Sequence, residues 1–420
     1  MKLMTKNMTI LSLGICAVFA LTACNDSNDD QSQNTPSTQP QDQRDQRFLN
    51  AKAGDILQVQ IADLIPTQGA VGYDQIYYKL GRWQGDWNRQ TWQADPTNQL
   101  YYLNKTIGKK FSDYCEAIGA KSRDDFSSME QLKAANLKQL DSFGCAEQPA
   151  TETADLKTVV VGYDGRLYLT DGHHTMTQLR ELPDGGETLK VWVRVVDNYS
   201  SLKTADEFWT KMVANGRAWL RNGQNQSITY QQLPKNLGLK SATNPTGMEE
   251  NQYRSLMYFV RDIGYSKPDN ATDFLEFLWQ DWLEAQVKTG MVQPLSFYHL
   301  DAKIYGGADV LASTSIKKDL TLSGSATGYT AAVANYALLI GTVAPETVIY
   351  QNQTAKSLGS LNLQKNADKG SVTANAISTF DELNRDEVKK DGTPRSGGSV
   401  WYAVHYRECG KPTTGTCWGW

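Results

Sequence analysis

The feature that most constrains this fold is a pair of short apolar runs joined by a tight-turn sequence and followed directly by a helical pattern. The runs lie at 159–161 and 167–169, and Asp164-Gly165 between them supplies residue types that tolerate the positive φ angles of a hairpin turn. Apolar side chains then recur at helical spacing from Met176 to Leu182, until a Pro-Asp-Gly-Gly sequence ends the pattern. We therefore expect an antiparallel hairpin whose second strand leads into a helix.

Polar residues suited to anion binding lie at the junction between that strand and that helix. Two of the chain's four histidines, His173 and His174, follow Asp171 and Gly172 here. Unpaired backbone N–H groups and the macrodipole at a helix start attract anions, with phosphate as the leading candidate. An imidazole donates to a phosphoryl oxygen or carries a proton, and a nearby carboxylate orients it, binds a metal or accepts a proton. The alternative is a plain helix cap, with Asp171 as the N-cap and two polar side chains in solvent.

Three separated blocks carry a resemblance that extends through more than half of the chain. They are residues 63–72 (DLIPTQGAVG) with Lys79 beyond them, residues 169–174 (LTDGHH), and residues 252–256 (QYRSL) leading to 277–282 (FLWQDW). In order and spacing they resemble the ParB-like nuclease family, a branch of the ParB/sulfiredoxin fold, over roughly residues 55 to 290. The resemblance implies an α+β fold, in which a small mixed β-sheet with helices is extended by a helical half.

The same blocks supply the candidate site residues. Catalysis is expected from Asp171, His173 and His174, and substrate binding from Pro66, Thr67, Gln68, Gly72, Lys79, Gly172, Thr175 and Arg254. Similar small-molecule kinases of this fold carry Asp-Gly-His-His-Arg, whereas Thr175 stands where their arginine is. A bidentate phosphate clamp is therefore lost from that position, and Arg180 and Arg254 are the candidates to replace it.

The amino terminus predicts export and a lipid anchor. Lys2 and Lys6 precede an apolar run that is too short to span a bilayer and ends in Leu21-Thr22-Ala23-Cys24. This resembles the bacterial lipoprotein cleavage box, which implies a signal peptide at 1–24 and lipidation of Cys24. Residues 25–47 contain no aliphatic or aromatic side chain larger than that of proline, so we expect a disordered polar tether. The expected location is the bacterial cell envelope, with the protein facing the periplasm; which of the two membranes holds it stays open.

Four further cysteines remain after the signal peptide. Export to an oxidising compartment predicts disulfides rather than metal ligands, and four thiols allow three pairings. We expect the nearest-neighbour pairing, Cys115 with Cys145 and Cys409 with Cys417, because each closes a local loop.

Composition describes a globular chain long enough for two units. Hydrophobic residues make up 40% and charged residues 21% of the chain, and the formal net charge is −4. The sequence has no dense stripe of basic residues, so the charge pattern argues against a nucleic-acid partner. Such a partner nevertheless stays an open alternative. We expect a ParB/sulfiredoxin-like domain with its helical extension at 48–295. A C-terminal region at 296–420 follows, with a helix at 329–340 and a β-rich appendage in which 401–406 is the clearest strand.

Three functions follow from these observations. The first is a nuclease-like phosphodiesterase in which Asp171 orients a metal or an imidazole, a histidine transfers the proton and Gln68 positions the substrate. The second is an envelope lipoprotein that binds an anionic ligand or a protein partner without turnover. The third is a nucleotide-dependent small-molecule kinase, against which the exported location argues. Cofactors are undetermined, and a divalent metal stays an open alternative. The expected partners are the membrane, through the lipid, and a phosphoryl-containing small molecule or nucleic acid.

Overall fold

The computed structural model describes residues 42–84, 87, 93–265, 267, 273–300, 328–343, 379–380, 382–383 and 398–409. The predicted signal peptide, most of the predicted tether and Cys417 lie outside these ranges. The folded unit begins at Arg44, whose guanidinium donates to the Ser200 carbonyl oxygen over 2.9 Å. Arg47 pairs with Asp63 at 2.8 Å. The last residues of the predicted tether, 44–47, are therefore in contact with the folded unit.

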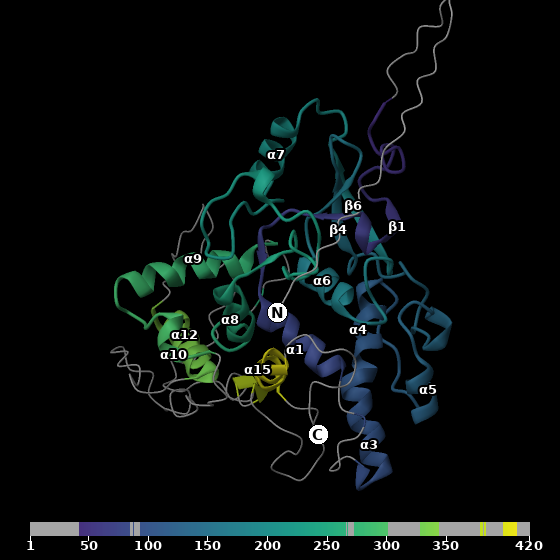
Figure 1. Ribbon diagram of the computed structural model, residues 1–420, viewed down its shortest axis with the longest axis vertical. Helices are drawn as coiled ribbons and strands as arrows, with labels where there is room; N and C mark the ends of the chain where they lie inside the picture. The colour runs from purple at the N-terminus through teal and green to yellow at the C-terminus, as the bar shows by residue number, and fades with distance from the viewer. Residues whose placement is uncertain are drawn as a thin grey trace, which may run out of the picture. The chain divides into compact units, whose positions relative to one another are not determined.

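A mixed five-stranded sheet lies at the centre of the first half of the fold (Figure 1). Its order is β1 (Ile56–Gln60), β6 (Lys190–Asn198), β4 (Lys157–Val161), β5 (Leu167–Leu169) and β2 (Leu64–Pro66). β1 and β6 are antiparallel, as are β4 and β5, whereas β4–β6 and β2–β5 are parallel pairs. A separate parallel pair joins β3 (Ala70–Val71) to β7 (Glu249–Glu250). The expected α+β class and the hairpin between β4 and β5 are confirmed.

Helices connect several strands of this sheet and form most of the second half of the fold. In chain order they are α1 (Tyr73–Trp83), α3 (Pro96–Leu103), α4 (Lys109–Ala117), α5 (Met129–Ala134), α6 (His173–Glu181), α7 (Ala205–Ala214), α8 (Gln252–Val260), α9 (Leu275–Lys288), α10 (Leu295–Tyr298), α12 (Tyr329–Val343) and α15 (Ser399–Cys409). Local sequence explains several starts. The Asp95 carboxylate caps α3 before a proline at its first position, and Thr204 and Asn251 cap α7 and α8. The helix predicted after the hairpin is confirmed as α6, and the helix predicted at 329–340 is confirmed as α12. None of the helices described here has the length and apolar content that a membrane span requires.

Strand alternation divides the apolar residues of the sheet between two faces. Val159, Leu169 and Val193 face a core shared with α1, α4 and α6. Val160 and Tyr168 point the other way, against the aromatic face of α7. A third core joins α8, α9, α10 and α12. The two halves of the chain therefore have separate cores. α1 belongs to the core of the first half and α8 to that of the second, and these two helices contact each other.

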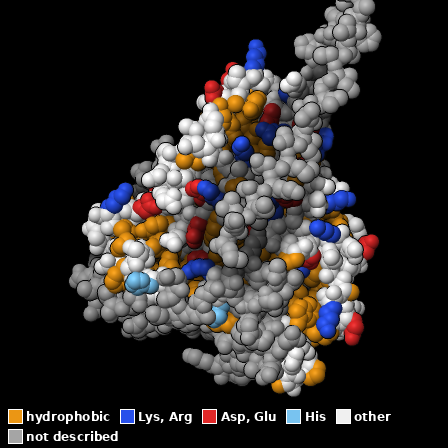
Figure 2. All heavy atoms as spheres, viewed as in Figure 1, with side chains coloured by type: hydrophobic (Ala, Val, Ile, Leu, Met, Phe, Trp, Pro, Cys, Tyr) orange, Lys and Arg blue, Asp and Glu red, His pale blue; other side chains and the backbone are white. Residues whose placement is uncertain are grey.

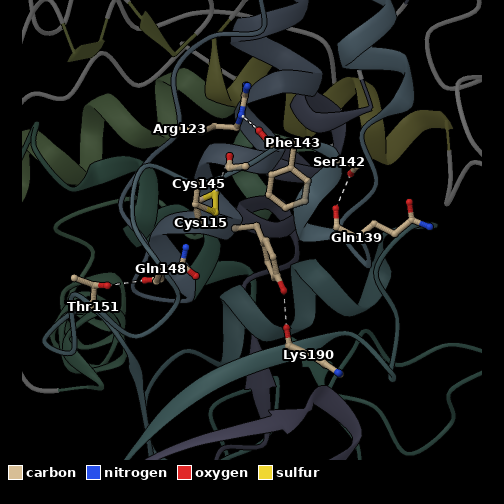
Figure 3. Close-up of a disulfide and its surroundings, with 11 residues drawn as sticks. Cys115, Arg123, Gln139, Ser142, Phe143, Cys145, Gln148, Thr151 and Lys190 are labelled. Carbon is tan, nitrogen blue, oxygen red and sulfur yellow. Dashed lines mark hydrogen bonds between the residues drawn. A yellow bond between two sulfur atoms is a disulfide. The ribbon is translucent and has the colours of Figure 1, made fainter.

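A disulfide joins Cys115 of α4 to Cys145, as expected (Figure 3). It closes a segment of 30 residues that carries α5 and returns beside α4. The ring of Phe143 packs on Phe111 with centroids 4.8 Å apart, and the Tyr114 hydroxyl donates to the Lys190 carbonyl oxygen over 2.6 Å. The cross-linked segment is thereby held against the sheet. Cys409 ends α15, and its predicted bond to Cys417 lies outside the described residues.

The predicted C-terminal strand at 401–406 is wrong, because these residues form the middle of α15. Val400, Ala403 and Val404 are buried in the core of α8, α9 and α12, while Tyr402 and Tyr406 are buried against the core that contains α1. A helix that packs between two cores is apolar on two faces. Its sequence therefore shows no single apolar stripe and resembles the sequence of a buried strand. The described part of the C-terminal region is therefore a packed component of the fold and not an appendage.

An ion pair attaches α15 to the start of α1. Nε and Nη2 of Arg407 contact the two carboxylate oxygens of Asp74 at 2.9 and 2.6 Å, and Nη1 donates to the Leu300 carbonyl oxygen over 2.7 Å. Asp74 is 1% exposed. A buried carboxylate depends on such a partner, because desolvation of an unpaired charge costs several kcal/mol.

We predict that Arg407→Met lowers the free energy of unfolding by about 3 kcal/mol, since it leaves Asp74 buried and unpaired. Urea denaturation at neutral pH measures this loss. In the double variant Asp74→Asn/Arg407→Met, which removes the stranded charge, at least half of the loss should be regained. Equal losses in the single and double variants would contradict the role of this ion pair.

Candidate functional site

The turn between β5 and α6 places a left-handed glycine at the helix start. Gly172 is the N-cap residue with φ of 101°, a conformation that favours glycine, and no side chain caps the helix. A Cβ at this position would lie 2.5 Å from the Lys157 side chain. The alternative in which Asp171 caps the helix is therefore not what the structure adopts. Among the described residues, no side chain accepts from the first N–H groups of α6, as an anion site requires.

A cleft with a volume of about 820 Å³ opens beside this helix start. Asp171 and Thr175 line it from the α6 junction, and Lys79 lines it from α1. Its remaining charged walls come from β4 and the chain before it, from β6, from α4 and from the chain before α9: Lys157, Asp155, Arg194, Asp113, Glu116, Lys267 and Asp273. Three predicted site residues thus meet in one cleft with charged residues from distant parts of the chain.

The cations of the cleft differ in how far they are already paired. Lys79 contacts the Asp113 carboxylate at 2.9 Å, and Lys157 lies 3.7 Å from Asp171. Arg194, by contrast, has a buried Nε that lacks any hydrogen-bond partner within the part of the chain that the structure describes. A buried guanidinium N–H without an acceptor is costly, so an anion in the cleft would relieve it.

Asp273 is a carboxyl group with altered acidity in this cleft. Desolvation by the cleft walls and the charge of Asp171 raise the pKa of Asp273 to about 6. The residue is nevertheless solvent-exposed by surface area, and water therefore offsets part of this desolvation. Asp171 and Asp273 therefore line the same cleft, and Asp273 is partly protonated near neutral pH.

Both imidazoles of the motif lie behind the cleft wall, where they accept hydrogen bonds from the backbone. Nε2 of His173 accepts the Thr67 N–H over 3.0 Å, and Nε2 of His174 accepts the Gly72 N–H over 2.9 Å. An imidazole that accepts through Nε2 is neutral and carries its hydrogen on Nδ1. Burial lowers the pKa of His173 to about 3 despite the nearby Asp171, and burial with the charge of Arg254 holds the pKa of His174 well below its usual range. Protonation of either ring would break its hydrogen bond.

The block at 66–72 supports the site from behind and does not line the cleft. Pro66 ends β2 beside Leu169, and Thr67 donates its hydroxyl to the Leu169 carbonyl oxygen over 2.6 Å. The Gln68 side chain is buried and donates to the Ala70 carbonyl oxygen. At Gly72, a Cβ would lie 2.8 Å from the backbone nitrogen of Ser255, so only glycine fits there.

Neither arginine proposed to replace the missing clamp lines the cleft. Arg254 donates to Gln75 over 3.0 Å and lies 3.3 Å from Glu276, and Arg180 pairs with Glu187. The guanidinium in the cleft is that of Arg194, which sequence reasoning missed together with Lys157 and Asp273. A signal for Arg194 was present in the strand at 189–196, where this charged residue stands between Val193 and Val195.

The described residues contain no group of three or more His, Cys, Asp or Glu side chains arranged to hold a metal ion. Acidic and basic side chains are interspersed on the face shown in Figure 2, and its described part has no extended patch of one sign. This agrees with the charge pattern of the sequence.

Comparison with known proteins gives a family match and similarities to solved structures. A family model described as "Putative ParB-like nuclease" matches residues 57–285, which include the sheet, the α6 junction, α8 and most of α9. No curated protein matches the chain. Among solved structures, "Crystal structure of protein Atu1540 from Agrobacterium tumefaciens" is 20% identical, with 56% of this chain and 82% of that chain covered at a TM-score of 0.32.

The buried His173 should make folding sensitive to mild acid. Its pKa of about 3 in the folded state lies below the ordinary value of 6.5, so below pH 6.5 the unfolded chain binds more protons and stability falls with pH. His173→Gln keeps an acceptor for the Thr67 N–H but does not titrate. Between pH 7 and pH 5 we expect the free energy of unfolding to fall by about 2 kcal/mol more in the wild type than in this variant.

Urea denaturation at both pH values measures that difference. Subtracting the variant removes the contributions of Asp273 and Glu250, whose pKa values are raised to about 6 and about 7 and act in the opposite direction. If the free energy of unfolding falls equally in the two proteins, His173 takes up a proton in the folded state as readily as in the unfolded chain. The imidazole would then again be a candidate for proton transfer.

Proposed function

The chain belongs to the family described as "Putative ParB-like nuclease", and on that premise we propose that the cleft beside α6 binds a phosphoryl-containing ligand and hydrolyses a phosphodiester bond in it. The observation that carries the proposal is Arg194, which lines the cleft beside the start of α6 and whose buried Nε lacks a hydrogen-bond partner among the described residues. Guanidinium and helix-terminal N–H groups are both donors that suit phosphoryl oxygens. Lys157 and Lys267 add positive charge to the same walls.

Proton transfer in this proposal belongs to the two aspartates. Asp171 accepts a proton from the water that attacks phosphorus, and protonated Asp273 donates its proton to the leaving oxygen as the P–O bond breaks. The raised pKa of Asp273 supports the donor role, because a carboxyl group with a pKa of about 6 is partly protonated near neutrality. His173 and His174 act as positioning residues, since each holds a backbone N–H of the 66–72 block.

One observation favours a second candidate function, binding without turnover. Both histidines of the motif are engaged with the backbone, so the residues first expected to transfer protons have structural partners. Turnover of bis(4-nitrophenyl) phosphate decides between the two candidates. If hydrolysis occurs and Asp273→Asn lowers kcat at least tenfold while ligand affinity is kept, the enzyme is supported. Phosphoryl binding without any turnover would favour the binding protein.

We also propose that the chain is exported and anchored to a membrane through Cys24. The lipoprotein-type sequence at 21–24 supports this, and the Cys115–Cys145 disulfide is a cross-link typical of oxidising compartments. Metabolic labelling with palmitate tests the proposal, and label retained in Cys24→Ser would contradict it.

We predict that Arg194→Gln weakens phosphoryl binding about tenfold, because it removes a charge-assisted donor from the cleft. Isothermal titration of the intact chain with phosphate, pyrophosphate, nucleoside monophosphates and short single-stranded DNA measures the affinity. Arg166→Gln is the matched control, since Arg166 is exposed, pairs with Asp164 at 2.7 Å and does not line the cleft. Equal affinity in Arg194→Gln and Arg166→Gln, or no binding by any of these compounds, would overturn the proposal.

A further inference from the structure

A second cavity adjoins the cleft and has a different chemical character. It has a volume of about 650 Å³ and is lined by the end of α7, the chain at 215–221 and the start of α9. Apolar and aromatic side chains contribute to its walls, although more of the lining surface is polar than apolar. These side chains are Val213, Ala218, Trp219, Leu220, Phe274 and Leu278. Asp273 lines both this cavity and the phosphoryl cleft, so the two spaces meet at that residue.

Hydrogen bonds also connect the second cavity to the start of α6. The backbone N–H of Trp219 donates to the Thr67 carbonyl oxygen over 2.9 Å, and the Thr67 N–H donates to His173 at the start of α6. The second cavity is therefore held in fixed relation to the helix start where the phosphoryl group is expected.

One polar atom in the wall of this cavity lacks a partner within the described residues and points to a ligand. The indole of Trp219 is 7% exposed, and its Nε1 donor is buried without a hydrogen-bond acceptor in the part of the chain that the structure describes. The ring stacks on Phe274 and Phe277, and the Arg221 guanidinium lies 4.8 Å from its centroid. An acceptor on a bound molecule would satisfy the Nε1–H. At the rim, Val213 is 48% exposed.

We propose that this second cavity binds the organic part of the phosphoryl ligand, and that this part is an aromatic group carrying a hydrogen-bond acceptor. The inference rests on the proposed function, because it assigns the phosphoryl group to the cleft beside α6. The apolar and aromatic side chains bury the ring, and the acceptor satisfies the Trp219 Nε1–H. A pocket of this size is typical for small organic molecules.

Phosphonates test the proposal, because their P–C bond is not hydrolysed during the measurement. Isothermal titration of the intact chain with methylphosphonate, phenylphosphonate and 4-acetylphenylphosphonate separates the phosphoryl group, the ring and the acceptor. For the wild type we expect phenylphosphonate to bind about tenfold more tightly than methylphosphonate, and the acetyl group to add about fivefold.

Variants assign each gain to its contact. Ala214→Trp fills the cavity from an exposed position at the end of α7, so it should abolish the gain from the ring and leave methylphosphonate unchanged. Ala214→Ser is its control and should bind like the wild type. Trp219→Phe keeps the aromatic stack but removes the donor, and should abolish only the gain from the acetyl group.

The outcomes separate this inference from the proposed function. Equal affinity for methyl- and phenylphosphonate, or an unchanged ring gain in Ala214→Trp, overturns the second cavity as a binding site while phosphoryl binding stands. A gain from the acetyl group that survives in Trp219→Phe overturns the role of the indole donor. If no phosphonate binds and the phosphate compounds also fail, the proposed function itself is wrong.

Discussion

The backbone N–H groups of Thr67 and Gly72 lie inside the protein and need acceptors there, and the architecture of the site depends on the two imidazoles that supply them. A buried donor left unpaired costs about 1–3 kcal/mol, which is a substantial part of the stability of a domain. Because His173 and His174 are the first two residues of α6, these bonds fix the 66–72 block to the start of that helix. Parallel pairing of Pro66 with Leu169 and the Thr67 hydroxyl bond to Leu169 hold the same block to the strand before the helix.

This arrangement leaves the front of the helix start available to a ligand. The imidazoles lie behind the cleft wall, and Asp171 and Thr175 line the cleft itself. At the N-cap, Gly172 takes the left-handed conformation and has no side chain that could cap the helix. The remaining walls are brought in from elements that have their own supports. The Cys115–Cys145 disulfide links the segment after α4 to that helix, and Arg407 of α15 pairs with Asp74 at the start of α1. Charges separated by more than a hundred residues therefore share one space because several cores hold their helices in place.

Local sequence was informative where a turn signal or a single apolar stripe marks an element. The hairpin at 157–169 was indicated by Asp164-Gly165 between two apolar runs, and the helix at 173–181 by an apolar stripe that packs on the sheet core. The same reasoning failed at 401–406, where α15 is buried on two sides and its apolar residues follow no single period. It also missed Asp273, because a carboxylate that precedes a helix is ordinary in sequence and acquires its character only from its neighbours.

By itself, the sequence determined the α+β class, the extent of the ParB-like region, the Cys115–Cys145 pair and the junction at which a site was to be sought. The class and the extent follow from the resemblance that three separated sequence blocks carry. The cysteine pair and the junction follow from local patterns that do not depend on what packs against them. Only the tertiary structure decided that the histidines accept backbone hydrogen bonds, that Arg194 and not Arg180 or Arg254 enters the cleft, and that Asp273 joins the cleft to a second, aromatic cavity. The physical reason is that burial, hydrogen-bond partnership and the proximity of charges arise between residues distant in the chain, and no local pattern records them.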